Sequence, residues 1–189
     1  MNTPAHIALN GFLLGRRGFA RSPWPIAVGA LLPDLPMLAF YAYQRGLRGA
    51  PERTLWREIY FQPQWQAFFD AFNSLPLIAL AAFFAWRAKR PAWLACLASM
   101  ALHCAADLLL HNEDAHGHFW PFSAWHFRSP VSYWDPRRYG AIFAALELAA
   151  TLAACVALWR RGGSWRAIGA GAGALYAAGV AFALWMWAG

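Results

Sequence analysis

Long apolar runs separated by short polar stretches dominate the chain. Four of these runs match the length of about 20 residues that a helix needs to cross the hydrocarbon core of a bilayer. They cover residues 68–86, 91–110, 139–159 and 167–187. Apolar runs of this length are typical of membrane-spanning helices, so the pattern predicts an all-α integral membrane protein.

A further apolar run, residues 23–43, is interrupted by prolines. Pro33 and Pro36 stand on either side of Asp34. Proline breaks a helix, and broken helices occur at membrane depth where they line a site or a cavity. Asp34 is therefore a candidate ligand, although a carboxylate at this position can also cap a second half-helix. With this run the prediction is a helical bundle of about five membrane segments, one of them short or broken.

The remaining segments are shorter or more polar. Residues 3–15 favour a short amphipathic helix that is too short to span, and residues 44–66 favour a loop or a surface helix. Residues 111–138 form a histidine-rich loop between two spans. The length of 189 residues predicts a single integral membrane domain over residues 1–189.

Composition and charge support a membrane protein and argue against a nucleic-acid partner. The chain is 60% hydrophobic and 13% charged, with a net charge of +7. The basic residues form small clusters between apolar runs, as loops facing the cytoplasm do. Three such clusters contain no acids: Arg16, Arg17 and Arg21; Arg87, Lys89 and Arg90; Arg160, Arg161 and Arg166. The positive-inside rule places these clusters in the cytoplasm and the histidine-rich loop outside.

Histidines and carboxylates gather in the stretch HCAADLLLHNEDAHGHFWPFSAWHFRSPVSYWD, residues 103–135. Five of the six histidines of the chain lie here. With a helical rise of about 1.5 Å per residue, counting from the basic clusters brings polar groups of five segments to one layer, roughly 15–25 Å from the cytoplasmic end. That layer holds His6, Asp34, Asp70, Asn73, His103, Asp107 and Glu147. Polar groups at membrane depth are costly and mark functional sites.

Imidazole and carboxylate groups together are ligands for zinc, and also for manganese or iron. His103 and Asp107 stand at i and i+4 on one helix face and form a two-ligand clamp. The other candidate metal ligands are His6, Asp34, Asp70 and His111. The candidate catalytic residues are Asp70, His116 and His118, the last two as further ligands or as groups that handle protons. The expected cofactor is a divalent metal, zinc first, with manganese or iron as alternatives.

Other interpretations of these residues stay open. Asp70 also suits a carboxylate at a helix N-terminus, Cys104 suits a small apolar filler better than a metal ligand, and the loop histidines also suit a wet loop near lipid head groups. Buried Asp and His residues also occur in transporters and proton paths. A third class is a non-catalytic protein whose polar cluster only holds helices together.

Several of these motifs resemble a family of bacterial inner-membrane proteins, the YdjM-like family of metal-dependent hydrolases. The resemblance covers most of residues 1–130 and is carried by His6, Pro33-Asp34, the HxxxD motif of His103 and Asp107, and Pro121-Phe122-Ser123. The motif order is also similar to that of zinc-dependent phospholipases C. The resemblance implies a multi-pass protein of the bacterial inner membrane that hydrolyses a lipid-linked or other phosphoester near the outer face, with membrane lipid as its partner. One departure is Asn73, which stands where the family has a histidine before Ser-Leu; an amide is a poorer ligand for transition metals than imidazole.

Overall fold

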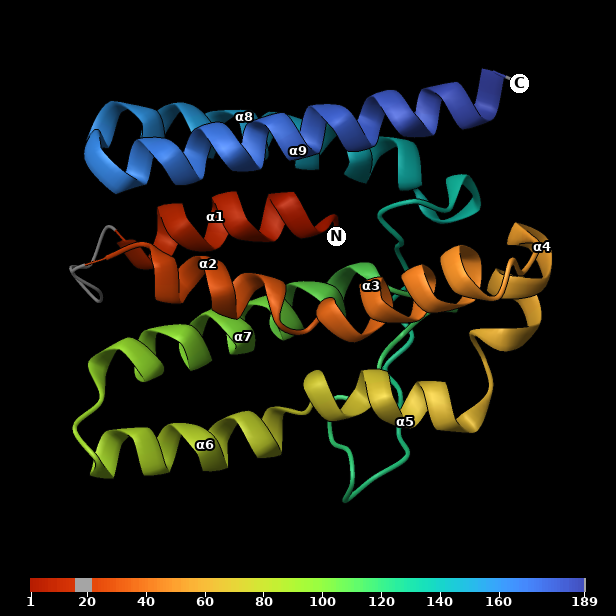
Figure 1. Ribbon diagram of the computed structural model, residues 1–189, viewed down its shortest axis with the longest axis horizontal. Coiled ribbons are helices and arrows are strands. Elements are labelled where there is room, and N and C mark those ends of the chain that lie inside the picture. The colour runs from red at the N-terminus through yellow and green to blue at the C-terminus, as the bar shows by residue number, and fades with distance from the viewer. Residues whose placement is uncertain (16–21, 189) are drawn as a thin grey trace.

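The apolar runs fold into long helices that lie side by side (Figure 1). The computed structural model describes residues 1–15 and 22–188, with side chains up to residue 183. Within these residues four segments have the length and composition of membrane spans. They are Pro63–Arg87, α7 (Pro91–Leu110), α8 (Gly140–Arg161) and the part Gly163–Ala183 of α9 (Gly163–Ala188). This confirms the predicted all-helical fold with several membrane segments.

The proline-containing run forms a bent helix pair, as predicted. The pair consists of α2 (Trp24–Leu31) and α3 (Leu35–Tyr41), and α3 continues into the π-helical segment η1 (Ala42–Leu47). The helix axis bends by 55° between the two halves, and together they are long and apolar enough to count as a fifth span. Asp34 lies at the break, but its side chain makes no capping hydrogen bond to α3. The carboxylate is therefore available to other partners.

The span predicted at 68–86 is broken as well, and it begins earlier. α5 (Pro63–Phe72) ends before Asn73, and α6 (Leu75–Arg87) begins after Ser74, whose hydroxyl accepts a hydrogen bond from the Leu77 amide. Asp70 therefore lies in the last turn of α5 and not in the first turns of one continuous helix. Ser74 explains the break, because serine is a preferred N-cap and Pro76 follows at a position that tolerates proline.

The polar segment between these broken spans forms short helical turns. α4 (Glu52–Thr54) leads into the π-helical segment η2 (Leu55–Ile59). Phe40, Leu55, Tyr60 and Phe69 form a buried cluster that joins α3, η2 and α5. This cluster attaches the polar segment to the ends of the two broken spans.

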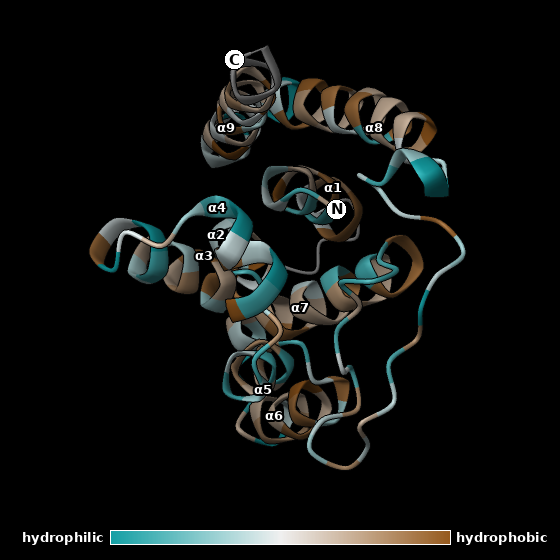
Figure 2. Ribbon diagram, turned by 90° about the vertical axis from the view of Figure 1, so that its right-hand side faces the viewer, coloured by the Kyte–Doolittle hydropathy of each residue, from teal (hydrophilic) through white to brown (hydrophobic). Residues whose placement is uncertain are grey.

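The short helix α1 (Thr3–Gly15) occupies the middle of the bundle (Figure 2). It packs against α2 on one side and against α8 and α9 on the other, and it also touches α7. The interface with α8 and α9 includes Ala8, Ala154 and Ala172, all buried. Small residues let helix backbones approach closely, which explains how a helix too short to span is enclosed by spans.

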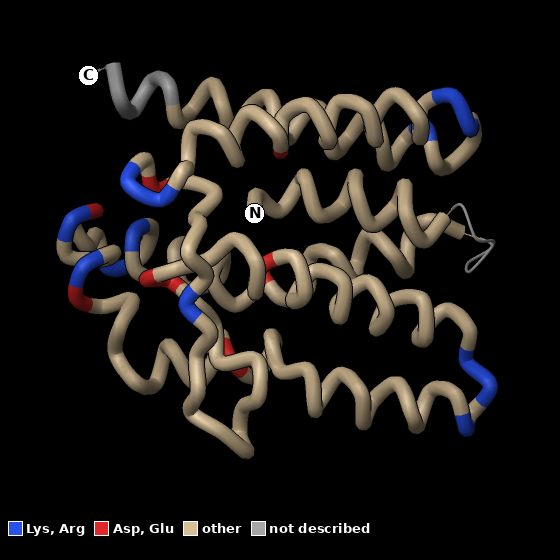
Figure 3. Tube along the Cα trace, turned by 180° about the vertical axis from the view of Figure 1, so that it is seen from behind, with Lys and Arg blue, Asp and Glu red and all other residues tan. Residues whose placement is uncertain are grey.

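The two basic turns within the described residues lie at the same end of the bundle (Figure 3). One joins α6 to α7 and holds Arg87, Lys89 and Arg90; the other joins α8 to α9. The first basic cluster, Arg16, Arg17 and Arg21, lies outside the described residues. The histidine-rich loop lies at the opposite end and leads through the 3-10 turn η3 (Pro136–Arg138) into α8.

Candidate metal centre

The last turns of α7 carry the two residues of the predicted clamp. His103 and Asp107 are fully buried, at 0% and 1% exposure. His103 Nε2 lies 3.0 Å from Oδ2 of Asp107. The i, i+4 spacing puts both side chains on the face of α7 that meets α1 and α2, as the sequence predicts.

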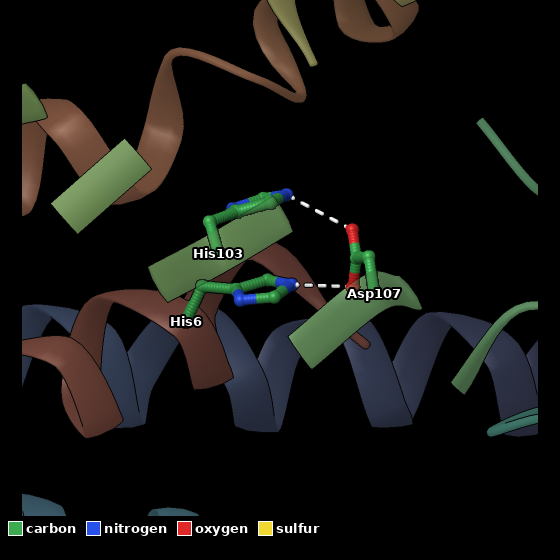
Figure 4. A group of neighbouring side chains, drawn as sticks. All are labelled: His6, His103 and Asp107. Atoms are coloured by element: carbon green, nitrogen blue, oxygen red, sulfur yellow. Dashed lines mark hydrogen bonds and ion pairs between the residues drawn. The ribbon is translucent and has the colours of Figure 1, made fainter. Parts of the chain in front are cut away.

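His6 reaches the same carboxylate from α1 (Figure 4). Its Nε2 lies 2.9 Å from Oδ1 of Asp107, so the two histidines face the two oxygens of one carboxylate. The imidazole rings stack with centroids 3.5 Å apart and planes 14° from parallel. His6, His103 and Asp107 each offer one ligand atom, and these three atoms lie within 4.8 Å of one another.

Asp34 borders this triad from the break between α2 and α3. Its Oδ1 lies 3.5 Å from His103 Nε2, and its Oδ2 accepts a hydrogen bond of 2.5 Å from the Thr3 hydroxyl. The break at Pro33 is what brings a carboxylate from a second segment to this point. Thr3 was not predicted, although it shares a face of α1 with His6, three residues further on.

The donor set of the triad fits a divalent cation. The Nδ1–H group of His103 donates a 2.8 Å hydrogen bond to the Ala30 carbonyl, so Nε2 is the ring nitrogen that faces the two carboxylates. Nε2 lies 3.0 Å from Asp107 and 3.5 Å from Asp34 without the alignment of a hydrogen bond to any described residue. Carboxylate oxygens around a buried nitrogen favour a positive charge between them, either a proton on Nε2 or a metal ion. A hydrogen bond from the other ring nitrogen to a backbone carbonyl is the usual arrangement for a metal-binding histidine.

His111 and the start of the chain close the triad from the loop side. His111 Nε2 lies 3.4 Å from Asp107 Oδ1, and its Nδ1 lies 3.0 Å from Asp114. The amino group of Met1 lies 2.9 Å from the same oxygen of Asp107. Asp107 is therefore surrounded by nitrogen atoms on three sides, from α1, α7 and the loop.

Glu147 joins α8 to the same layer through Asn2. The Asn2 side chain donates a 2.5 Å hydrogen bond to Oε1 of Glu147, and its backbone amide donates to Oε2 at 3.2 Å. Glu147 is thus buried in α8 with both oxygens paired. It holds the first turn of α1 in place and does not face the triad atoms.

Asp70 has its polar contacts in the histidine-rich loop. Its Oδ1 accepts a 2.7 Å hydrogen bond from the Gly117 amide, and its Oδ2 lies 3.6 Å from His126 Nε2. Asp70 is not one of the three side chains of the triad. The pairing with His126 was not predicted, because the path of an irregular loop leaves no periodic signal in the sequence.

His116 and His118 are buried in this loop between the triad and α5. The ring centroids of His111 and His116 lie 5.6 Å apart, and those of His116 and His118 lie 6.1 Å apart. Burial, and to a smaller extent the neighbouring His111, lowers the pKa of His116 to about 3. Its ring is neutral near pH 7, and its Nδ1 has no hydrogen-bond partner among the described residues. His118 Nδ1 donates to the Asn73 carbonyl at 3.0 Å.

Asn73 serves the backbone of the broken spans. Its amide nitrogen donates to the carbonyls of Pro33 and Phe69, at 3.2 and 3.1 Å. Its side-chain oxygen lies 3.8 Å from the Cys104 sulfur. Since carbonyl oxygens only accept, the nitrogen must face both of them, and the amide joins α5 to the break before α3 and to α7.

The fold and this site define a multi-span helical membrane protein with a buried His–His–Asp triad that can bind a metal. Comparisons with models of protein families, with curated proteins and with solved structures give no match. The resemblance to the YdjM-like family therefore stays a prediction that rests on the motifs alone.

Proposed function

We propose that the protein is a membrane-bound, metal-dependent hydrolase that holds a divalent metal between His6, His103 and Asp107. The observation that supports this most directly is Nε2 of His103, which lies 3.0 Å from Asp107 and 3.5 Å from Asp34 in a fully buried site. Two imidazoles and a carboxylate suit zinc best, with manganese or iron as alternatives. When bound, such a metal polarises a phosphoryl oxygen and acidifies water.

The other residues of the layer would add ligands or support them. Asp34 adjoins His103 and is proposed as a further ligand, and His111 adjoins Asp107 on the loop side. His116 is neutral near pH 7, and its Nδ1 has no hydrogen-bond partner among the described residues, which suits a further metal ligand better than a group that accepts a proton. Asp70 orients the loop through the Gly117 amide, and through this contact it supports the loop histidines.

The proposed substrate is a phosphoester, lipid-linked or otherwise membrane-associated, in the outer half of a bacterial inner membrane. Its support is the position of the triad, because His103 and Asp107 lie in the half of α7 that is away from the basic α6–α7 turn. A site at this depth meets lipids more readily than dissolved metabolites. The motif order shared with zinc-dependent phospholipases C is consistent with phosphoester chemistry by analogy.

Metal content tests the proposal directly. We expect the detergent-purified protein to carry at least one equivalent of zinc, manganese or iron by elemental analysis, and a His103→Ala/Asp107→Ala double variant to carry none. Asp135→Asn is the matched control, because Asp135 pairs with Arg137 in the loop and has no contact with the triad. Circular dichroism and size-exclusion elution show whether each variant is folded.

Phosphoester hydrolysis by the metal-loaded protein is the second test. We expect the metal-loaded parent to hydrolyse a phosphoester and the conservative Asp107→Asn variant to lose both the metal and the hydrolysis. Absence of metal in the parent, even after reconstitution with zinc, manganese or iron, would contradict the proposal. The buried triad would then serve to hold α1, α2 and α7 together, and its removal would lower stability alone.

A further inference from the structure

An apolar groove lies between the end of α9 and α3. Met37, Leu38 and Tyr41 of α3, Trp56 of η2, and Phe182 and Ala183 of α9 line it, and its volume is about 410 Å³. Ligand sites of proteins have volumes of roughly 300–1,000 Å³ and mostly apolar linings. Because both long walls are membrane segments by composition, the groove faces the hydrocarbon of the bilayer.

A smaller cavity lies beside the groove, at the start of α1. It has a volume of about 120 Å³ and is lined by Asn2, by Pro4 of α1 and by Tyr176 of α9. Ala183 lines both the groove and this cavity. Asn2 pairs with Glu147, and the next residue, Thr3, bonds to Asp34 beside the triad. The smaller cavity thus adjoins the groove at Ala183 and reaches the first turn of α1, where Thr3 contacts the candidate ligand Asp34.

The far end of the groove reaches a positively charged segment. Glu52 lies in its lining, accepts hydrogen bonds from Tyr41 and Trp56, and pairs with Arg45 at 3.2 Å. Tyrosine and tryptophan in this arrangement are typical of the membrane interface. Residues 42–59 hold four arginines and two glutamates, an excess of positive charge that attracts anionic lipid head groups. The arginines are Arg45, Arg48, Arg53 and Arg57.

We infer that this groove binds the hydrocarbon chain of an anionic, phosphate-bearing lipid that enters sideways from the bilayer. The chain lies against α3 and α9, the arginines draw anionic lipids to the rim, and the smaller cavity leads toward the polar layer. This inference deepens the proposed function by naming the substrate class, and it rests on that function only for the reaction, since lipid binding requires no metal.

Photolabelling tests the binding alone. The protein is placed in phosphatidylcholine nanodiscs that contain a small fraction of phosphatidylglycerol with a photoreactive group in its acyl chain. We expect adducts at Met37, Leu38 and Phe182 that saturate and are displaced by unlabelled phosphatidylglycerol more strongly than by phosphatidylcholine. Exposed Leu146 and Leu152 of α8 report on unspecific contact with surrounding lipid.

A variant with a large side chain in the groove, compared with the same substitution elsewhere, tests the location of the site. Ala183→Trp should abolish the saturable adducts on α3, whereas Leu152→Trp, on the exposed face of α8, should leave them unchanged. Labelling of α3 that does not saturate and equals that of α8 would overturn the inference. So would an absence of lipid adducts together with a disulfide-linked dimer of an Ala183→Cys variant, because a second copy would then cover the groove.

Activity separates this inference from the proposed function. If the protein hydrolyses phosphoesters, Ala183→Trp should lower turnover of a long-chain phospholipid severalfold and spare that of a short, water-soluble phosphoester. Saturable labelling in a protein without metal or hydrolysis would leave the lipid site standing and reject the hydrolase. Equal hydrolysis of both substrates by parent and variant would reject the lipid site and keep the hydrolase.

Discussion

His103 is the residue on which the metal centre depends most. Its Nδ1–H is fixed on the Ala30 carbonyl, and this contact alone decides that Nε2 turns toward Asp34 and Asp107. A buried polar atom without a hydrogen bond costs about 1–3 kcal/mol, and a bound ion would offset this cost. His103 therefore carries more information about the site than the other four histidines of residues 103–135.

Asn73 allows a test of whether a position binds the metal or only joins backbone segments through hydrogen bonds. We expect Asn73→Asp to destabilise the protein by roughly 2–4 kcal/mol, because a carboxylate would face the Pro33 and Phe69 carbonyls with no proton to donate. Metal content of the folded fraction should not change. The measurements are thermal unfolding in detergent and elemental analysis.

A matched asparagine lies on α1. Asn10 is also buried and donates to the carbonyl and the hydroxyl of Ser99. Asn10→Asp should therefore show a similar loss of stability. If Asn73→Asp instead kept its stability and bound more metal than the parent, Asn73 would occupy a ligand position.

At the scale of elements, the contact between α2 and α7 sets the position of His103. Gly29 of α2 faces the backbone of α7, and a Cβ added there would lie 2.0 Å from the Cys96 carbonyl oxygen. Ser99 donates to the Ile26 carbonyl one turn away, at 2.7 Å. The close approach of the two helices is thus what brings the Ala30 carbonyl within reach of the imidazole.

We expect Gly29→Ala to weaken both the fold and the metal site. Overpacking of this kind costs about 1–3 kcal/mol, and the shift of α2 would lengthen the hydrogen bond from His103 to Ala30. Loss of a hydrogen bond that orients a metal-binding histidine lowers metal affinity by about 10–100-fold. Thermal unfolding and competition with a chelator of known affinity measure the two effects.

Gly171 is the matched control on α9. A Cβ added there meets nothing within 4 Å, and alanine is the better helix former. Gly171→Ala should therefore leave metal affinity unchanged and stability equal or slightly higher. Equal metal affinity in Gly29→Ala and in the parent would show that His103 does not depend on the α2–α7 contact.

At the scale of the whole molecule, the charge distribution predicts the orientation in the membrane. The α6–α7 and α8–α9 turns, which hold basic residues and no acids, lie at one end of the bundle, and the histidine-rich loop lies at the other. We expect Ser123→Cys in the loop to react with a membrane-impermeant maleimide in intact bacteria, and Ser164→Cys in the α8–α9 turn to react only after permeabilisation. The reverse pattern would contradict the positive-inside assignment. Both serines are exposed, so accessibility within the protein does not bias the result.

The sequence was sufficient for the spans and for the polar layer, but not for the details of the site. Run length and hydropathy predicted the membrane helices. Counting residues predicted that His6, Asp34, His103 and Asp107 lie at a similar depth, because each residue of a helix advances a fixed distance along its axis. The break at Asn73 was missed, since the apolar pattern passes through it. The contacts of residues 1–3 and the pairing of Asp70 with His126 depend on loop paths and rotamers, which periodicity does not encode.

The central position of α1 has a consequence for how the protein is made. His6 is synthesised well before α8 and α9, which are among the helices that enclose α1. At about 5–20 residues per second, roughly ten to thirty seconds separate the synthesis of His6 from that of Ala172. His103 and Asp107 lie on α7, so all three side chains of the triad are synthesised before α8 and α9. The site can therefore take up an ion before the last two described helices close over α1.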